Sequence, residues 1–296
     1  AGIPFWKDAG ELTTSAVDLG VAHPTGFPAW AALARLFSLI PVGTIHLRIA
    51  LASAIPMALA TALLAHIVKP KGNSSWEDLC VRGLALPILI LSSPTIWFLG
   101  STPEVYAFAA LLALIWIHLN TSNTSVHTRA AATGALMGLP PGVHITALFG
   151  GLSLGTCFPW KAVRRLFSNP QQWLFPGALF LVALAHAFGL SVAASRNPEL
   201  NFDNPSTLSS LWRHLSAEGI QERFAAAGAR PSFDESLDLH LGFFQSDLGF
   251  IVFAIAVFGA IRSLRSARTI SLVLLIAADT AYNIFINPMG RWDLQT

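Results

Sequence analysis

Two carboxylates near the start of the chain, Asp8 and Glu11, are the first candidates for chemistry. They stand three residues apart in the stretch FWKDAGELTTSAVDLGVAHPTGFP, residues 5–28. At that spacing both side chains share one face if the segment is helical. A carboxylate within hydrogen-bond reach of an acceptor hydroxyl can act as a general base. On spacing alone, however, an ordinary solvated loop that carries helix-capping residues is the simpler interpretation.

The composition indicates the surroundings of these carboxylates. Of the 296 residues, 53% are hydrophobic and 11% are charged, whereas a soluble domain carries about 25% charged residues. This balance predicts a protein that crosses the membrane several times. The net charge of +2 gives no indication of nucleic-acid binding. Cys80 and Cys157 fit no metal-binding spacing, and the sequence has no P-loop, GxGxxG or HExxH motif, which argues against a nucleotide-driven pump.

The apolar runs predict an all-α, polytopic membrane protein with about eight membrane segments. Short basic loops belong on the cytoplasmic side of a membrane. This chain has four such loops, at 69–82, 120–129, 161–165 and 262–268. They fall on one side only if 130–158 is a hairpin that turns at Pro140-Pro141-Gly142. The segments are then 45–68, 84–99, 104–119, the two arms of 130–158, 173–194, 248–261 and 270–286.

The whole chain, 1–296, is expected to be a single transmembrane domain with two polar segments on the outer face. The first, 1–44, carries the acidic stretch and ends in a short amphipathic helix at 29–40 that lies in the membrane interface. The second, 195–247, contains an amphipathic helix within 204–220 that could serve as a lid or as a platform for the acceptor. The apolar face of this helix would consist of Leu208, Leu211, Trp212 and Leu215.

Two histidines and two arginines are further candidates at the outer ends of the spans. His23 belongs to a His-Pro-Thr-Gly-Phe-Pro run that predicts a rigid turn, with a ligand role as the alternative. His144 follows the predicted hairpin turn. Arg48 and Arg291 could each hold a phosphate, or could equally extend to the lipid headgroups.

Thr102, Pro103 and Glu104 predict the start of a helix. Thr102 would be the cap, Pro103 the first helical residue, and Glu104 an acid in the first turn. Tyr106 follows and could face the same outer cavity as the acidic stretch. Capping is sufficient to explain Glu104 without a functional role.

Polar groups also occur inside the predicted spans, where ionisable residues tend to be functional or paired. Asp279, Asn283 and Asn287 follow one another at intervals of four and form one stripe. The stripe either faces a cavity or packs polar groups between helices. His186 lies within 173–194, where a neutral, hydrogen-bonded histidine is the commoner case.

Several motifs together resemble those of a bacterial multi-spanning family of unassigned function, allied to eukaryotic transmembrane protein O-mannosyltransferases. The resemblance begins with a Trp-x-Asp-x-Gly-Glu run and a Gly-x-x-His-Pro-Pro-Gly-x-Pro run, in which Thr25 replaces the usual proline. Weaker similar pieces extend it over nearly the whole chain, although Val143 stands where relatives have asparagine. The matching residues of the two runs are Trp6, Asp8, Gly10, Glu11, Gly20, His23, Pro24, Gly26 and Pro28. The weaker pieces are STPEVYAF, GLPPGVHITAL, NPSTLSSLWRHLSAEGI and NPMGRWDLQT.

The resemblance extends to the GT-C glycosyltransferase superfamily and implies a reaction. Asp8 would be the general base and Glu11 its partner, and a polyprenyl-phosphate sugar, mannose first, would be the donor. The acceptor would be a hydroxyl of a protein or glycan, attacked with inversion. The residues expected to bind substrate are His23, Arg48, Glu104, Tyr106, His144 and Arg291. No protein-held metal is expected, although stabilising the departing phosphate calls for arginine or a divalent cation, so the cofactor stays open.

The resemblance also implies a location and partners. It places the protein in a bacterial inner membrane, with the site on the periplasmic face, among membrane lipids and in contact with the sugar donor. It also implies that a first span precedes residue 1. The alternative function is a non-catalytic membrane protein, either a transporter or a structural subunit of a larger membrane assembly. A transferase should place Asp8 beside a lipid groove, whereas a transporter should show a path lined by His186 and Asp279.

Overall fold

The computed structural model describes residues 8–68, 92–154, 171–226 and 232–287. Within these ranges the fold is helical, and the one β contact is an isolated parallel bridge between Val21 and Asn201. The predicted all-α class is therefore confirmed for the described residues. Arg291 and the first part of the predicted span 84–99 lie outside them.

Three described helices are long and apolar enough to cross a membrane: α3 (Ile45–Val68), α11 (Gln171–Ser195) and α15 (Ala267–Phe285). Two more candidates are bent. The short helix α6 (Pro94–Ser101) meets α7 (Tyr106–Thr121) at 107°, and α14 (Phe233–Arg262) breaks at Gly249 with a bend of 101°. The described part of the chain thus contains three to five candidate spans, and the predicted count of eight is not confirmed.

The predicted hairpin 130–158 has unequal arms in the structure. Its first arm is α8 (Val126–Gly138), after which the chain turns through the short 3₁₀ segment η2 (Pro140–Gly142), where the turn was predicted. The second arm begins as the 3₁₀ helix η3 (Ile145–Leu152) rather than as an α-helix. Residues 155–158 lie outside the described ranges.

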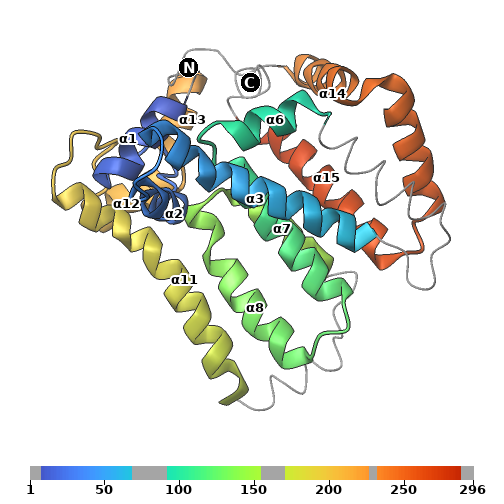
Figure 1. The fold of residues 1–296 in the computed structure, drawn as a ribbon, viewed down its shortest axis with the longest axis horizontal. Helices are drawn as coiled ribbons and strands as arrows, with labels where there is room; N and C mark the ends of the chain where they lie inside the picture. The colour runs from blue at the N-terminus through green and yellow to red at the C-terminus, as the bar shows by residue number, and fades with distance from the viewer. Residues whose placement is uncertain (1–7, 69–91, 155–170, 227–231, 288–296) are drawn as a thin grey trace.

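Helices α8 and α11 pack closely against each other, and two glycines permit it (Figure 1). Gly134 and Gly138 lie one turn apart on α8. A Cβ at Gly134 would lie 2.3 Å from the carbonyl oxygen of Pro176, and a Cβ at Gly138 would lie 2.6 Å from that of Phe180. Small residues spaced in this way let helix backbones approach each other in a membrane.

One end of the molecule gathers the ends of three helices that precede or follow basic loops. The rings of His66 on α3 and His118 on α7 lie 5.2 Å apart, and Arg268 on α15 donates a hydrogen bond to the Ile67 carbonyl at 3.0 Å. The ends of α3 and α7 and the start of α15 are therefore neighbours. This arrangement agrees with the prediction that the adjoining basic loops share one side.

The polar segments gather at the opposite end of α3, where α1 (Ala9–Asp18) and α2 (Pro28–Ser38) pack together (Figure 1). Leu12 of α1 and Trp30 of α2 are fully buried in one cluster. Arg35 of α2 donates to the Val17 carbonyl at 2.6 Å. The predicted helix 29–40 is confirmed as α2, whereas the predicted acidic loop contains a helix, α1.

The second polar segment also folds onto this end, through α12 (Leu208–Leu215) and α13 (Glu218–Ala226). The amphipathic helix predicted within 204–220 is present, but its predicted apolar face is divided. Leu211 is buried against Leu190 of α11, whereas Leu208 and Trp212 are 76% and 71% exposed. Residues four apart on a helix share a face, so Leu208 and Trp212 together point outward.

Candidate functional site

The turn between α1 and α2 brings His23 against the two carboxylates of the acidic stretch. Asp8 precedes α1 at its N-cap position and Glu11 lies in its first turn. The backbone N–H of His23 donates to Oε1 of Glu11, and the Nδ1 atom of its ring lies 3.2 Å from the same oxygen. The other ring nitrogen, Nε2, lies 3.9 Å from Oδ2 of Asp8. We call these three residues the acidic cluster.

Glu11 and His23 hold each other in their charged forms. Burial raises the pKa of Glu11, but the hydrogen bonds and the charge of His23 outweigh it, and the net pKa lies below its ordinary value. Burial lowers the pKa of His23, but the contact with Glu11 and the charges of Asp8 and Glu104 outweigh it, and the net pKa is raised. Each residue therefore favours the charged form of the other.

The side chain of Asp8 is more accessible to solvent than that of Glu11. Its side chain is 51% exposed, against 25% for Glu11. Although Asp8 occupies the N-cap position, its side chain makes no capping hydrogen bond. Helix capping therefore does not account for Asp8. Of the two acids, Asp8 is the one whose oxygens can reach an incoming hydroxyl.

A buried histidine from far along the chain supports the turn that carries His23. Gly26 has a φ of +80°, and a Cβ there would lie 2.7 Å from Leu190 and 2.9 Å from Nε2 of His214. His214 of α12 is fully buried, with its Nδ1 atom 3.8 Å from Asp203. Burial lowers the pKa of His214 to about 4, despite the nearby carboxylate. His214 was not among the predicted site residues, although it lies one helical turn after Leu211 of the predicted apolar face.

Glu104 also belongs to this region, and the predicted helix start around it is wrong. Helix α7 begins at Tyr106, and the Thr102 hydroxyl donates to the Phe98 carbonyl instead of capping α7. The backbone of Glu104 is held by Ser53 of α3. The Ser53 hydroxyl accepts a hydrogen bond from the Glu104 N–H and donates one to the Glu104 C=O, both at 2.8 Å. Glu104 is buried, and its charge reaches His23.

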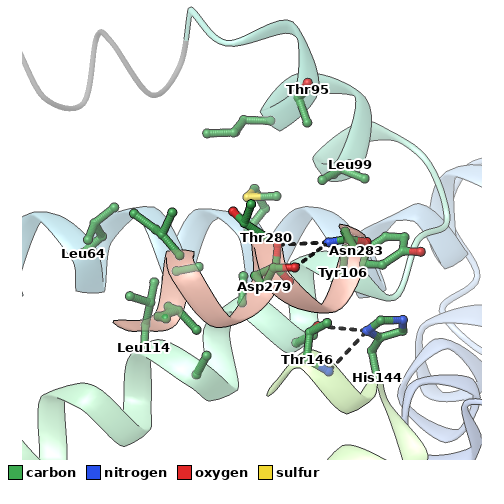
Figure 2. Close-up of a pocket in the computed structure, with 18 of the residues that line it drawn as sticks. Leu64, Thr95, Leu99, Tyr106, Leu114, His144, Thr146, Asp279, Thr280 and Asn283 are labelled. Atoms are coloured by element: carbon green, nitrogen blue, oxygen red, sulfur yellow. Dashed lines mark hydrogen bonds between the residues drawn. The ribbon is translucent and has the colours of Figure 1, made fainter. Parts of the chain in front are cut away.

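A cavity of about 540 Å³ lies between α3, α6, α7, η3, α14 and α15. Figure 2 shows Leu64 and Leu114 at one end and Tyr106 and His144 at the other. The rings of Tyr106 and His144 lie 4.9 Å apart, and Nδ1 of His144 lies 2.8 Å from the Thr146 hydroxyl. Tyr106 and His144 therefore line one cavity, but none of the three residues of the acidic cluster is among its lining residues. His23 lies near enough for its charge to act on His144.

The polar stripe of α15 faces this cavity. The side-chain amide of Asn283 donates to the backbone oxygen of Asp279 at 3.0 Å and to its carboxylate at 3.4 Å. Asn287 in turn donates to the Asn283 side chain at 3.1 Å. All three residues line the cavity. Of the two arrangements considered for the stripe, the structure has the one that faces a cavity.

The remaining candidates are placed elsewhere. The guanidinium group of Arg48 donates to the carbonyls of Ser38 and Ile40 at 2.7 and 2.8 Å, which fixes the connection between α2 and α3. His186 packs over the hairpin turn, where a Cβ at Gly142 would lie 1.8 Å from its Nε2 atom. His186 is not among the residues that line the cavity.

The acidic cluster also has the composition of a cation site. One ligand atom from each of its three residues lies within 4.8 Å of the others, and two carboxylates with an imidazole suit several divalent metals. Binding through His23 would require its neutral imidazole, because metal ligands must be deprotonated. The contacts of His23 with Glu11 favour the protonated ring instead.

Together, the fold and the site define an integral membrane protein with a largely apolar cavity and a separate acidic cluster whose histidine acts electrostatically on His144 of the cavity wall. The particular family follows from comparison with known proteins. The family model of the protein O-mannosyl-transferase TMEM260 N-terminal domain matches residues 8–166, and the chain belongs to this family. The predicted kinship with eukaryotic O-mannosyltransferases is thus confirmed.

A curated relative gives the scale of the match. The chain is 44% identical over 134 residues to the protein O-mannosyl-transferase TMEM260 of Mus musculus. The matched region covers 43% of this chain and 18% of the mouse protein. The chain therefore spans a small part of that relative's length. No solved structure matches it.

Proposed function

We propose that the protein transfers a sugar, mannose first, from a polyprenyl-phosphate donor to an acceptor hydroxyl on a protein or glycan. Family membership supports glycosyl transfer, and the name of the mouse relative supports mannose. The observation that carries the proposal is the acidic cluster, with its exposed Asp8, in a protein that also holds a largely apolar cavity. We place the reaction on the outer, periplasmic face of a bacterial inner membrane, in a GT-C-type site.

The proposed chemistry assigns different roles to the two acids. Asp8 accepts the proton of the acceptor hydroxyl, and the oxygen attacks the anomeric carbon of the donor sugar. The bond from that carbon to the phosphate oxygen breaks, polyprenyl phosphate leaves with the electron pair, and the configuration inverts. The exposure of Asp8 supports its role as base. Glu11 is committed to His23 and acts through it.

His23 supplies positive charge where negative charge develops on the departing phosphate. A fixed cation in that place stabilises the transition state more than the ground state. Its raised pKa favours the protonated ring, and Glu11 fixes that ring. In this proposal a side chain of the protein supplies charge that a metal ion would otherwise provide. Association with a larger membrane assembly stays a prediction.

The alternative function as a transporter is less well supported. It requires a path through the membrane lined by both His186 and Asp279. Asp279 lines the cavity, but His186 is packed against Gly142 and does not. Among the described residues, the two do not line a common cavity.

The test is transfer by the purified protein in lipid nanodiscs, with labelled polyprenyl-phosphate mannose and candidate acceptor proteins. Asp8→Asn should lower the rate by about 10²–10⁴-fold, the contribution of a general base. Asp18→Asn is the matched control, because Asp18 is an exposed acid at the other end of α1. Undiminished transfer by Asp8→Asn would remove the base assignment. Absence of transfer by the wild type with every donor would favour the non-catalytic alternative.

A further inference from the structure

The polar end of the cavity has a chemistry of its own. Its lining groups include Tyr106 and His144, together with Asp279 and Asn283 of α15 (Figure 2). The cavity volume of about 540 Å³ falls in the range of about 300–1,000 Å³ that is usual for small-molecule sites. Such sites combine an apolar lining with a few placed polar groups that fix the ligand's orientation.

Asp279 is an unusual group to find in this wall. It lies in a candidate membrane span, six residues before the end of α15 at Phe285, which places it about 9 Å along the helix from that end. Its Oδ2 atom accepts one long bond from Asn283. No residue in the described ranges hydrogen-bonds its Oδ1 atom. An ionisable side chain within a membrane span normally has a function or a partner.

The hydrogen bonds of the stripe run in one direction, toward this carboxylate. Asn287 donates to Asn283, and Asn283 donates to Asp279. The end of the stripe therefore presents an acceptor to the cavity. A side chain whose oxygens accept hydrogen bonds suits the hydroxyl groups of a ligand. The Tyr106 ring lines the same end and offers an apolar surface to a ligand there.

We propose that Asp279 and Asn283 bind the hydroxyl groups of the donor sugar and determine which lipid-linked sugar the protein accepts. This inference rests on the proposed function. The phosphate, which joins the isoprenoid chain to the anomeric carbon of the sugar, then lies toward His23. The sugar lies beside Asp279 and Asn283, with its anomeric carbon toward the acidic cluster.

The inference is tested by binding as well as by transfer. The affinity of the protein in nanodiscs is measured for polyprenyl-phosphate mannose and for bare polyprenyl phosphate. The wild type should prefer the lipid that carries the sugar. Asp279→Asn should reduce this preference by about 10-fold to 100-fold, the contribution of a hydrogen bond to a charged group, and leave affinity for bare polyprenyl phosphate unchanged. The control is Thr269→Val, on the same helix but not among the cavity-lining residues.

A transfer competition provides the second measurement. Equal amounts of polyprenyl-phosphate mannose and its glucose epimer are supplied, and the ratio of transferred sugars is read by mass spectrometry. Asp279→Asn should bring the ratio toward one. Asn283→Ala measures the same effect if Asp279→Asn does not fold, which the affinity for bare polyprenyl phosphate reveals. Unchanged preference in both variants, with transfer intact, would overturn this inference alone. A sugar preference that depends on Asp279 in a protein that transfers nothing would support the sugar site and overturn the proposed function.

Discussion

The ion pair between Glu11 and His23 allows a prediction whose size depends on pH. Glu11→Gln removes the negative charge but keeps an oxygen for the His23 backbone N–H. The substitution removes the charge from the contact between Oε1 and the His23 ring. This contact is 3.2 Å long, and both side chains are mostly buried. Hydrogen bonds to charged groups contribute about 1.5–3 kcal/mol. Since one contact remains, we expect a loss near the lower end, about 1.5 kcal/mol.

The direction of the pH dependence follows from the two pKa shifts. The pKa of His23 is raised above 6.5, so its contribution to stability is complete below pH 6.5 and is lost as pH rises through the raised value. The pKa of Glu11 is lowered from 4.5, so its contribution is complete above pH 4.5 and is lost as pH falls through the lowered value. The pair therefore stabilises most between pH 4.5 and 6.5.

The assay is the apparent melting temperature of the detergent-purified protein in EDTA. Glu11→Gln should lower it by about 3 °C at pH 5.5 and by less than about 1 °C at pH 9. Glu199→Gln, an exposed acid on the loop after α11, should change it at neither pH. Equal shifts for Glu11→Gln at both pH values would refute the argument, because a structural role without charge does not depend on the protonation of His23.

Three further predictions concern the metal, the membrane packing and the arginine. Sugar transfer should persist in EDTA, since His23 supplies the positive charge toward the phosphate in the proposed mechanism; loss of transfer that Mn²⁺ restores would contradict this. Gly134→Leu should lower the melting temperature by at least about 5 °C, because the new side chain would meet the Pro176 carbonyl. The control Gly189→Leu should not lower it, because the space around Gly189 is open. Arg48→Gln should lower the melting temperature, because its hydrogen bonds to backbone carbonyls are lost, and should leave KM for the donor unchanged. A raised KM with an unchanged melting temperature would instead support the predicted role of Arg48 in binding the donor phosphate.

The long helices could be predicted from the sequence because the signals are local. A run of apolar residues of sufficient length predicts a span wherever it occurs, and α3, α11 and α15 all follow such runs. The start of α7 was not predictable in this way. Thr102 and Glu104 carry the sequence signature of a helix start, but contact with Ser53 of α3 holds the Glu104 backbone outside the helix. Tertiary contacts of this kind override local propensity.

The candidate site could be predicted only in part, for the same reason. The spacing of Asp8 and Glu11 indicated a shared face, and the structure has them within one turn. His23 reaches the two carboxylates only because the chain turns between α1 and α2. This turn includes Gly26, which has a positive φ. The support from His214 depends on the folding of α12 beneath that turn. Neither contact is a property of any short stretch of sequence.

The site is assembled from two parts of the chain that relate differently to known proteins. The family match covers residues 8–166, which include the acidic cluster, Glu104, Tyr106 and His144. Asp279 and Asn283 lie outside it and line the same cavity as Tyr106 and His144. The proposed base and the proposed cation thus come from the shared part, while Asp279 and Asn283 come from α15. Because a base acts on any correctly placed hydroxyl but a sugar is selected by hydrogen bonds to its own hydroxyls, we expect the common chemistry to reside in 8–166 and the choice of donor to vary with α15.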